Sequence, residues 1–281
     1  MKVSIIMAGY FKLDGGAMFG VVPKVMWQKL NPADEHNMCT WAMRSLLIET
    51  EHRKILVDTG IGYKQGEKFR SHFYPSGASV VENLTIAGID KNDITDVFLT
   101  HLHFDHCGDA TEFDKDGKIV PTFPKATYWS NEKHWNWALE QNDREKASFL
   151  LENFVPRQEH GVLKFIPTDS KLPVNWLDGI RVHESNGHTK SMMLPDIPYK
   201  GSRMIFCADL IPSSFHLPLP YIMAYDLWPY DTLEEKTAFL ENALANDYYL
   251  AFQHDPKYAC CRLGRNEKGR IIAREISESL L

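Results

Sequence analysis

Short apolar runs alternate with polar and turn-forming segments along much of the chain. These runs are rich in Val, Ile, Leu and Met and are bounded by polar or turn-forming residues, a pattern that is typical of β-strands. The run at residues 54–57, for example, leads directly into the turn Asp58-Thr59-Gly60. The strands predicted in this way are 3–7, 45–49, 54–57, 96–99, 163–166, 180–184, 204–207, 248–252 and 271–274.

Other segments have the pattern of helices. The predicted helices are 79–87, 130–141, 145–154 and 232–246. Gly88 ends the first helix, Ser130 is the expected N-cap of the second, and Thr232 with Glu235 forms a capping box at the start of the last. The order of strands and helices predicts an α/β fold with two β-sheets and helices packed outside them. With no internal repeat or linker, one domain over 1–281 is expected.

The composition limits the classes of partner. The 281 residues are 44% apolar, enough for a large core, and carry a formal net charge of −6 with no block of like charge, which argues against nucleic acid. No run approaches the length of a membrane-spanning helix, and the N-terminal residues lack the features of a signal peptide. Five cysteines without a Cys-x-x-Cys spacing argue against a disulfide framework. A cytoplasmic protein without nucleic-acid or membrane partners is therefore expected.

Residues 101–106 read H-L-H-F-D-H, which has the character of a metal site. His101 and His103 follow a predicted strand, and side chains two positions apart in an extended chain point the same way, so two imidazoles can reach one ion. Asp105 and His106 come after the chain turns and can reach a second point nearby. A lone His-x-His would be weak support, but four ligand-type residues within six positions have no packing rationale.

Three further candidate ligands lie just past predicted strands, where α/β sheets gather functional groups. They are His188 in Gly-His-Thr, Asp209 in Ala-Asp and His254 in Gln-His-Asp. Each is weak alone, because a histidine after a strand is more often structural and Asp209 could be a turn residue. With the cluster they make five histidines and two aspartates, a set that can serve two divalent ions.

The remaining polar candidates have more ordinary interpretations. Asp58 is either a turn former or a carboxylate that orients a ligand imidazole, and we favour the second. His134 with Trp135 and Trp137 is expected to form a packing face on a helix. The histidines expected to be surface or core residues are His36, His52, His72, His134, His160 and His183.

The motifs together resemble those of the metallo-β-lactamase superfamily. H-L-H-F-D-H at 101–106 is similar to its H-x-H-x-D-H signature, and the Asp-Thr-Gly, Gly-His-Thr, Ala-Asp and Gln-His-Asp motifs occur in the order that this superfamily uses. The resemblance implies an αββα sandwich with two divalent metal ions at one edge of the paired sheets. Zinc is the first expectation, and iron, manganese or cobalt are alternatives.

The resemblance and the residue chemistry lead to one assignment of ligands. It gives His101, His103 and His188 to the first ion, Asp105, His106 and His254 to the second, and Asp209 to both as a bridge. Metal binding lowers the pKa of water to about 7, so a shared hydroxide would attack the substrate. Asp105 or Asp209 would then transfer the proton of that hydroxide to the leaving alkoxide.

Segments 14–24 and 223–229 resemble the YtnP-like branch of quorum-quenching lactonases, which is similar to the N-acyl-homoserine lactone lactonases. This implies a small-molecule lactone or ester substrate, ring opening, and a homodimer. The better-studied lactonases carry a Tyr three residues after the bridging Asp, where this chain has Pro212. His216 could replace it as a donor to the substrate oxygen, or could be a loop histidine. The acyl chain is expected against Met18, Phe19, Val21, Trp27, Phe104 or Trp228.

Other functions stay open at this stage. A phosphotriesterase of the methyl parathion hydrolase type would use the same hydroxide. Thioester hydrolysis of the glyoxalase II kind would need a basic cluster near the site, which the sequence does not show. RNA processing is disfavoured by the acidic charge. A non-catalytic metal-binding relative is disfavoured by the full ligand set, because structural zinc sites are usually closed by four ligands.

Overall fold

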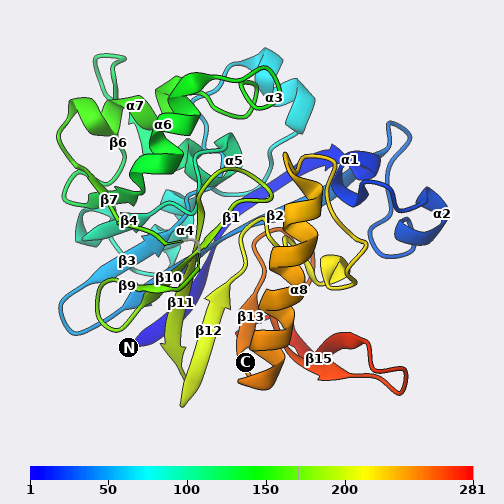
Figure 1. The fold of residues 1–281 in the computed structure, drawn as a ribbon. Coiled ribbons are helices and arrows are strands. Elements are labelled where there is room, and N and C mark those ends of the chain that lie inside the picture. The colour runs from blue at the N-terminus through cyan, green and yellow to red at the C-terminus, as the bar shows by residue number, and fades with distance from the viewer. Residues whose placement is uncertain (170, 281) are drawn as a thin grey trace. The chain divides into compact units, whose positions relative to one another are not determined.

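The structure is a computed structural model that describes residues 1–169 and 171–280. The chain forms two compact units, each built from two stretches of sequence (Figure 1). The first unit comprises residues 1–10 and 43–169, and the second comprises 11–42 and 171–280. The prediction of a single domain stays a prediction.

The main sheet of the first unit is mixed. Its strands are β1 (Lys2–Asp14), β2 (Met38–Glu49), β3 (Lys54–Val57), β4 (Asp96–Phe98), β7 (Thr127–Ser130) and β8 (Leu163–Phe165). They are hydrogen-bonded in this order, with β3, β4, β7 and β8 as parallel neighbours and β2 antiparallel to β3. Residues 11–14 of β1 and 38–42 of β2 belong to the second unit. A separate two-stranded sheet pairs β5 (Thr111–Phe113) with β6 (Ile119–Pro121).

The parallel part of this sheet explains where the H-L-H-F-D-H segment at residues 101–106 lies. Ile55, Leu56 and Val57 of β3 are all buried, a continuous apolar run of the kind that parallel strands show when both faces are covered. Strand β3 matches its prediction, and β4 ends at Phe98, one residue earlier than predicted. The residues from 100 to 106 therefore follow the carboxyl end of a parallel strand, where α/β sheets place functional groups.

The helices of the first unit include one that matches its predicted range to within one residue at each end. They are α3 (Glu67–Phe73), α4 (Val80–Ile86), α5 (Phe104–Cys107), α6 (Glu132–Glu140) and α7 (Leu151–Glu159). Helix α4 lies within the predicted 79–87: Ser79 caps it, and Glu82 completes a capping box.

Two other helix ends in this unit were predicted wrongly. The N-cap of α6 is Asn131, which accepts a hydrogen bond from His134 N, whereas Ser130 is the last residue of β7. The helix predicted from residue 145 begins only at Leu151. The Asn142 side chain accepts from the backbone N–H of Glu145, and such local side-chain bonds compete with helix formation.

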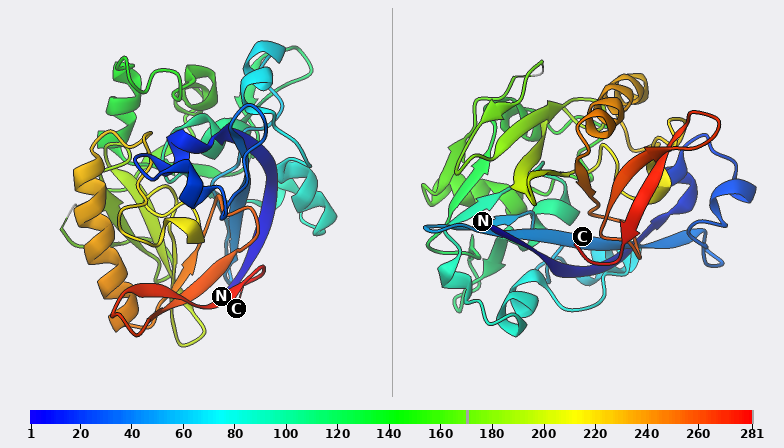
Figure 2. Two further views of the ribbon diagram at one scale, coloured as in Figure 1. Left: turned by 90° about the vertical axis from the view of Figure 1, so that its right-hand side faces the viewer. Right: turned by 90° about the horizontal axis from the view of Figure 1, so that it is seen from below.

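The second unit is built on a seven-stranded mixed sheet. Its strands are β9 (Val174–Asn175), β10 (Arg181–Ser185), β11 (Met192–Tyr199), β12 (Ser202–Phe206), β13 (Tyr249–Ala251), β14 (Cys260–Arg265) and β15 (Ile271–Ser277). They lie in that order, with β12 parallel to β13 and the other neighbours antiparallel. The helices are α1 (Gly15–Phe19), α2 (Lys24–Trp27) and α8 (Pro229–Ala245), and α8 runs alongside the sheet (Figures 1 and 2).

The capping box predicted at Thr232 and Glu235 is wrong. Helix α8 begins three residues earlier, at Pro229, which suits the first helical position because it needs no N–H donor there. Glu235 instead accepts hydrogen bonds from Ser185 Oγ and from the backbone N–H groups of Asn186 and Gly187. It therefore fixes the loop that precedes His188.

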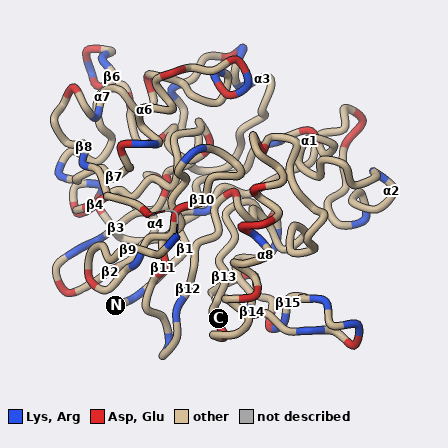
Figure 3. The backbone as a smooth tube through the Cα atoms, in the orientation of Figure 1, with Lys and Arg blue, Asp and Glu red and all other residues tan. Residues whose placement is uncertain are grey.

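Both units contain helices and a mixed sheet, which confirms the predicted α/β fold class. Lys, Arg, Asp and Glu are interspersed along the backbone of each unit (Figure 3). All five cysteines, the neighbouring Cys260 and Cys261 included, are buried thiols. Within 1–169 and 171–280, every helix is too short or too polar to cross a lipid bilayer.

Candidate metal centre

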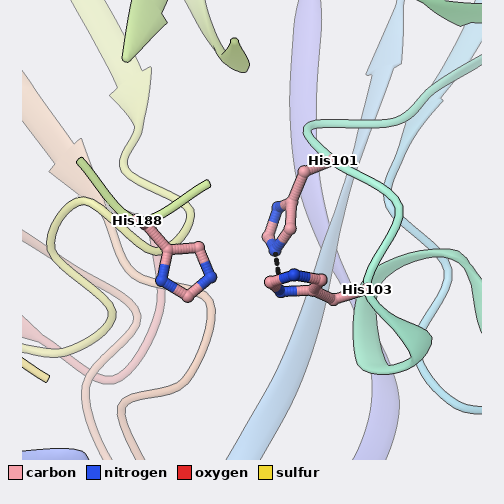
Figure 4. Close-up of side chains that lie close together, drawn as sticks. All are labelled: His101, His103 and His188. Atoms are coloured by element: carbon pink, nitrogen blue, oxygen red, sulfur yellow. Dashed lines mark hydrogen bonds between the residues drawn. The ribbon is translucent and has the colours of Figure 1, made fainter. Parts of the chain in front are cut away.

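The first unit holds four of the predicted ligands, which we call the first-unit ligand set: His101, His103, Asp105 and His106. All four are buried. His101 Nε2 lies 3.1 Å from His103 Nδ1, and the two rings face each other nearly at right angles (Figure 4). Zinc–nitrogen bonds of about 2.0–2.1 Å at a tetrahedral angle place two nitrogens roughly 3.3 Å apart. The pair is therefore spaced like two ligands of one ion.

Asp105 and His106 lie on the short helix α5, which starts directly after His103. Asp105 Oδ2 is 3.6 Å from His106 Nε2, so these two atoms can also approach one point. The helix is followed by Gly108, where a Cβ would collide with the backbone of Ile61. Glycine at this position allows the ligand-bearing turn to pack directly on the neighbouring loop.

Asp58 ties the first-unit ligand set together, as the second of its two interpretations predicted. Its Oδ2 lies 2.9 Å from His106 Nδ1, and its carboxylate also accepts from the Thr100 backbone N–H at 2.8 Å and the Thr100 hydroxyl at 2.7 Å. The carboxylate is fully buried, and Asp58 has a left-handed backbone conformation with a φ of 55°. Thr100 Oγ1 in turn lies 3.1 Å from His101 Nδ1.

The second unit holds the other three predicted ligands, which we call the second-unit ligand set: His188, Asp209 and His254. Asp209 lies at its centre, with Oδ2 3.2 Å from His188 Nε2 and Oδ1 3.2 Å from His254 Nε2. Its two oxygens thus point at two different imidazoles, the arrangement that a bridging carboxylate needs. Behind the set, Asp226 Oδ1 is 2.9 Å from His188 Nδ1, and the Ala42 carbonyl accepts from His254 Nδ1 at 2.7 Å.

The donor chemistry of both sets fits divalent metal ions. A carboxylate or carbonyl accepts the proton of one ring nitrogen in His103, His106, His188 and His254. In His101 the acceptor is Thr100 Oγ1, because that hydroxyl donates its own proton to Asp58. In each neutral imidazole the lone pair is therefore on the nitrogen that faces the other predicted ligands, which is the tautomer that metal binding requires.

The supporting acceptors Glu145 and Asp226 were not foreseen from the sequence. Glu145 is buried, its Oε1 lies 3.1 Å from His103 Nε2, and its Oε2 accepts from Trp137 Nε1 at 2.6 Å. His134, expected in a packing face, accepts a hydrogen bond from the Leu102 backbone N–H. No spacing in the sequence links Glu145 to His103, so only a general expectation that ligand histidines have a second partner could have pointed to it.

Replacing Glu145 should weaken metal binding without unfolding the protein. Glu145→Ala removes the acceptor that fixes His103, and we expect about 10- to 100-fold lower zinc affinity, with a smaller loss in Glu145→Gln, which keeps an acceptor oxygen. Competition with a chromophoric chelator measures this. Glu140→Gln, an exposed change on α6, is the matched control. Wild-type affinity in Glu145→Ala would show that Glu145 does not position His103.

His216 is held by the protein on both sides. Its Nε2 donates to the Met18 carbonyl at 2.9 Å, its Nδ1 lies 2.7 Å from Ser213 Oγ, and its ring stacks on Phe19. Burial lowers the pKa of His216 to about 3, so the ring is neutral at working pH. Both nitrogens are engaged within the second unit, which favours the structural alternative over the donor role predicted for it.

Asp109 is a buried carboxyl that the sequence did not single out. Its Oδ2 has no hydrogen-bond partner within the described part of the chain, and burial raises the pKa of Asp109 to about 7. The folded state therefore holds a proton that the unfolded chain releases near pH 4. The contribution of Asp109 to the free energy of unfolding is therefore highest below pH 4 and falls as the pH rises to 7.

We expect Asp109→Asn to remove this pH dependence. At pH 8 the variant should be more stable than the wild type by about 2–4 kcal/mol, and the difference should shrink as the pH falls towards 5. Urea unfolding at both pH values measures it, with Asp143→Asn as a control because the Asp143 side chain is 98% exposed. A variant that is equally stabilised at both values would contradict the assigned pKa.

The comparison with known families settles the membership of the chain. The sequence pattern of the metallo-beta-lactamase superfamily matches residues 44–254, most of the chain and all seven predicted ligands. The chain belongs to the metallo-β-lactamase superfamily. The resemblance noted in the motifs is thus confirmed for the superfamily, while the YtnP-like branch stays a prediction.

Three solved structures are similar to this chain over nearly its whole length. A probable metal-dependent hydrolase from Staphylococcus aureus is 28% identical, with a TM-score of 0.86 and full coverage of both chains. AidC, a dizinc quorum-quenching lactonase in complex with the product N-hexanoyl-L-homoserine, is 20% identical, with a TM-score of 0.78 over 99% of this chain and 95% of that one. AbOPH, a hydrolase of the β-lactamase superfamily, is 21% identical, with a TM-score of 0.77 over 98% and 93%.

Proposed function

We propose that this metallo-β-lactamase protein is a dinuclear metal-dependent hydrolase that opens lactone rings, N-acyl-homoserine lactones first among them. The observation that carries the proposal is the common geometry of the five imidazoles: one ring nitrogen of each lies within hydrogen-bond distance of a protein acceptor. The other ring nitrogen faces another predicted ligand. The similarity of the fold to the dizinc lactonase AidC supports the choice of substrate.

The proposal joins the two ligand sets into one centre. The ions would be held by His101, His103 and His188 on one side and by Asp105, His106 and His254 on the other, with Asp209 between them. Zinc is the proposed metal, because imidazole with carboxylate is a donor set that it favours. Bound there, two such ions would lower the pKa of water and polarise the ester carbonyl.

The residues of the chain would supply positioning and proton transfer. Asp58, Asp226 and Glu145 hold the rings of His106, His188 and His103, which fixes the direction of each ligand nitrogen. A carboxylate oxygen of Asp209 or Asp105 would take the proton released when the ring ester is attacked. The same oxygen would return it to the alkoxide that leaves the carbonyl carbon.

Several residues that were predicted to contact the acyl chain are buried in the core of the second unit. Met18, Phe19 and Trp27 are at most 1% exposed and pack within the second unit, with Phe19 stacked between Trp27 and His216. They form core structure and present little surface to a substrate. Trp228 at 38% exposure and Val21 at 91% are the apolar candidates from the second unit that keep accessible surface.

The cellular setting is proposed on the same basis. All five cysteines are thiols, which fits a reducing cytoplasm. The proposed partners are a small-molecule ester or lactone and a second copy of the chain, with no role for nucleic acid or membrane.

A side-by-side hydrolysis assay tests the proposal. The purified protein, with its bound metals measured, is given acyl-homoserine lactones of several chain lengths, simple lactones and a phosphotriester, and acid release is followed. We expect the highest kcat/KM on a lactone. Faster turnover of the phosphotriester would favour a phosphotriesterase of the methyl parathion hydrolase type, and no hydrolysis by the metal-loaded protein would favour a non-catalytic relative.

A further inference from the structure

The second unit contains a hollow of about 650 Å³ that the proposed hydrolysis does not use. It lies between α8, the segment 217–220 and the hairpin of β14 and β15. The hairpin extends away from the rest of the sheet (Figures 1 and 2). A volume of this size is in the range of sites for small molecules.

The walls of the hollow are mainly apolar. Leu217 and Leu240 are buried at 4% and 1% exposure, whereas Leu219 and Ile272 are 38% and 43% exposed. The apolar side chains that line it are Leu217, Pro218, Leu219, Pro220, Leu240, Ile271 and Ile272. Large apolar side chains that stay half exposed beside a cavity are the usual walls of a site for an apolar ligand.

Polar contacts hold these walls in place. Lys236 on α8 is buried, and its ammonium donates to the carbonyls of Pro218 and Tyr221 at 2.9 Å each. On the other side, Arg265 of β14 pairs with Glu241 of α8 at 2.5 Å. Both walls are therefore tied to the same helix, which keeps the hollow formed without a ligand.

The rim of the hollow carries a positive charge that its neighbours do not neutralise. The carboxylate of Glu241 already pairs with Arg265. Arg270 also lines the hollow, is exposed, and makes no side-chain ion pair with the described residues. The turn that bears it contains Lys268 and one acidic residue, Glu267, which is not part of the lining. An apolar hollow with a guanidinium at its rim is complementary to an amphipathic anion.

The hairpin is poorly suited to the other obvious occupant, a strand from a second copy. Strand β15 is the edge of the sheet, and an open edge is a template for pairing with another chain. Its register with β14 shifts between Cys260 and Arg262, and Glu275 has a φ of 49°. A bulge of this kind twists an edge strand and blocks further pairing.

We propose that the hollow between α8 and the β14–β15 hairpin binds an acyl chain that carries a carboxylate, with the chain against Leu219 and Ile272 and the carboxylate on Arg270. The chemistry is shared by a free fatty acid and by an acyl-homoserine. The second ligand would come from the proposed lactone hydrolysis, but the site does not depend on that activity.

Calorimetric titration of the purified full chain tests this site. The probes are dodecanoate and dodecyltrimethylammonium, both below their micelle-forming concentrations, and N-dodecanoyl-homoserine. We expect dodecanoate to bind at least tenfold more tightly than the cation of equal chain length. The ratio of the dodecanoate affinity to the N-dodecanoyl-homoserine affinity shows whether the site prefers a free fatty acid or an acyl-homoserine. Equal binding of anion and cation, or no binding of either anion, would overturn the proposal.

Variants locate the binding. Ile272→Asp and Leu219→Asp each place a carboxylate in the apolar wall and should weaken dodecanoate binding more than tenfold, whereas Arg270→Gln should weaken it about fivefold. Ile86→Asp is the matched control, because Ile86 is 79% exposed on α4 of the first unit. Equal affinities in Ile272→Asp and Ile86→Asp, with both proteins folded by circular dichroism, would exclude this hollow.

Two measurements separate this proposal from others. Titration repeated after chelation should give the same dodecanoate affinity, since the site needs no metal; loss of binding with the metal would place the ligand at the metal centre instead. Sedimentation of the wild type and Ile272→Asp should give the same mass. A dimer that Ile272→Asp dissociates would make the hollow an interface and overturn the proposal.

Discussion

Replacing Asp209 with Ala is expected to lower lactone hydrolysis by at least on the order of a thousandfold and to lower the metal content. The reason is the position of the carboxylate: its two oxygens lie 3.2 Å from His188 Nε2 and 3.2 Å from His254 Nε2. An alanine leaves the imidazoles in place but removes the only negative charge of the second-unit ligand set and the proposed bridge between two ions. Steady-state kinetics and elemental analysis of the same preparation measure both effects.

Two further variants make the Asp209 result specific. Asp209→Asn keeps the size of the side chain but loses its charge, and should also lose most of the activity. Asp143→Ala removes a carboxylate that is 98% exposed and should behave as the wild type. Full metal content together with full turnover in Asp209→Ala would remove Asp209 from the proposed centre.

Replacing Asp58 should have the largest effect on stability. Its buried carboxylate accepts from His106 Nδ1 and from the N–H and hydroxyl of Thr100, so Asp58→Ala leaves three buried donors without their acceptor. We expect a loss of about 3–5 kcal/mol in the free energy of unfolding. The left-handed backbone at Asp58, with a φ of 55°, adds strain for alanine. Urea unfolding of the metal-free protein measures the change.

Asp58→Asn separates the two roles of this carboxylate. Asparagine tolerates the left-handed backbone and its carbonyl can accept from Thr100, so its stability should lie well above that of the alanine variant. The loss of the negative charge weakens the hold on the His106 Nδ1 proton, and metal affinity should still fall about 10- to 100-fold. Unchanged metal affinity in Asp58→Asn would show that Asp58 only stabilises the turn.

Much of the fold could be predicted from the sequence where a signal is local. Strand β3 is a continuous apolar run between polar residues, and Gly88 marks the end of α4, so both were predicted within one residue. Strand β11 was missed because it contains Pro195 and Pro198, which argue against a strand. The start of α8 was misplaced because Glu235, which reads as a cap, bonds to the loop at 185–187 instead.

The same limit applies to the metal centre. The first-unit ligand set lies within six residues of sequence, so its composition alone indicated a metal site. The partners that orient the ligands, Glu145 and Asp226, are 42 and 38 residues from the histidines they contact. Such pairs depend on how distant loops pack, which no periodicity in the sequence records. For His216 the sequence suggested a donor to the substrate. In the structure both of its ring nitrogens are instead hydrogen-bonded within the protein.

Counting bound metal ions and following hydrolysis in one titration tests whether the protein is a dinuclear hydrolase. The protein is stripped with a chelator, zinc is added back in steps, and bound zinc and lactone turnover are measured at each step. We predict negligible turnover in the stripped protein and full activity at about two ions per chain. Undiminished hydrolysis after removal of the metal, or a protein that binds no zinc in its folded state, would contradict it.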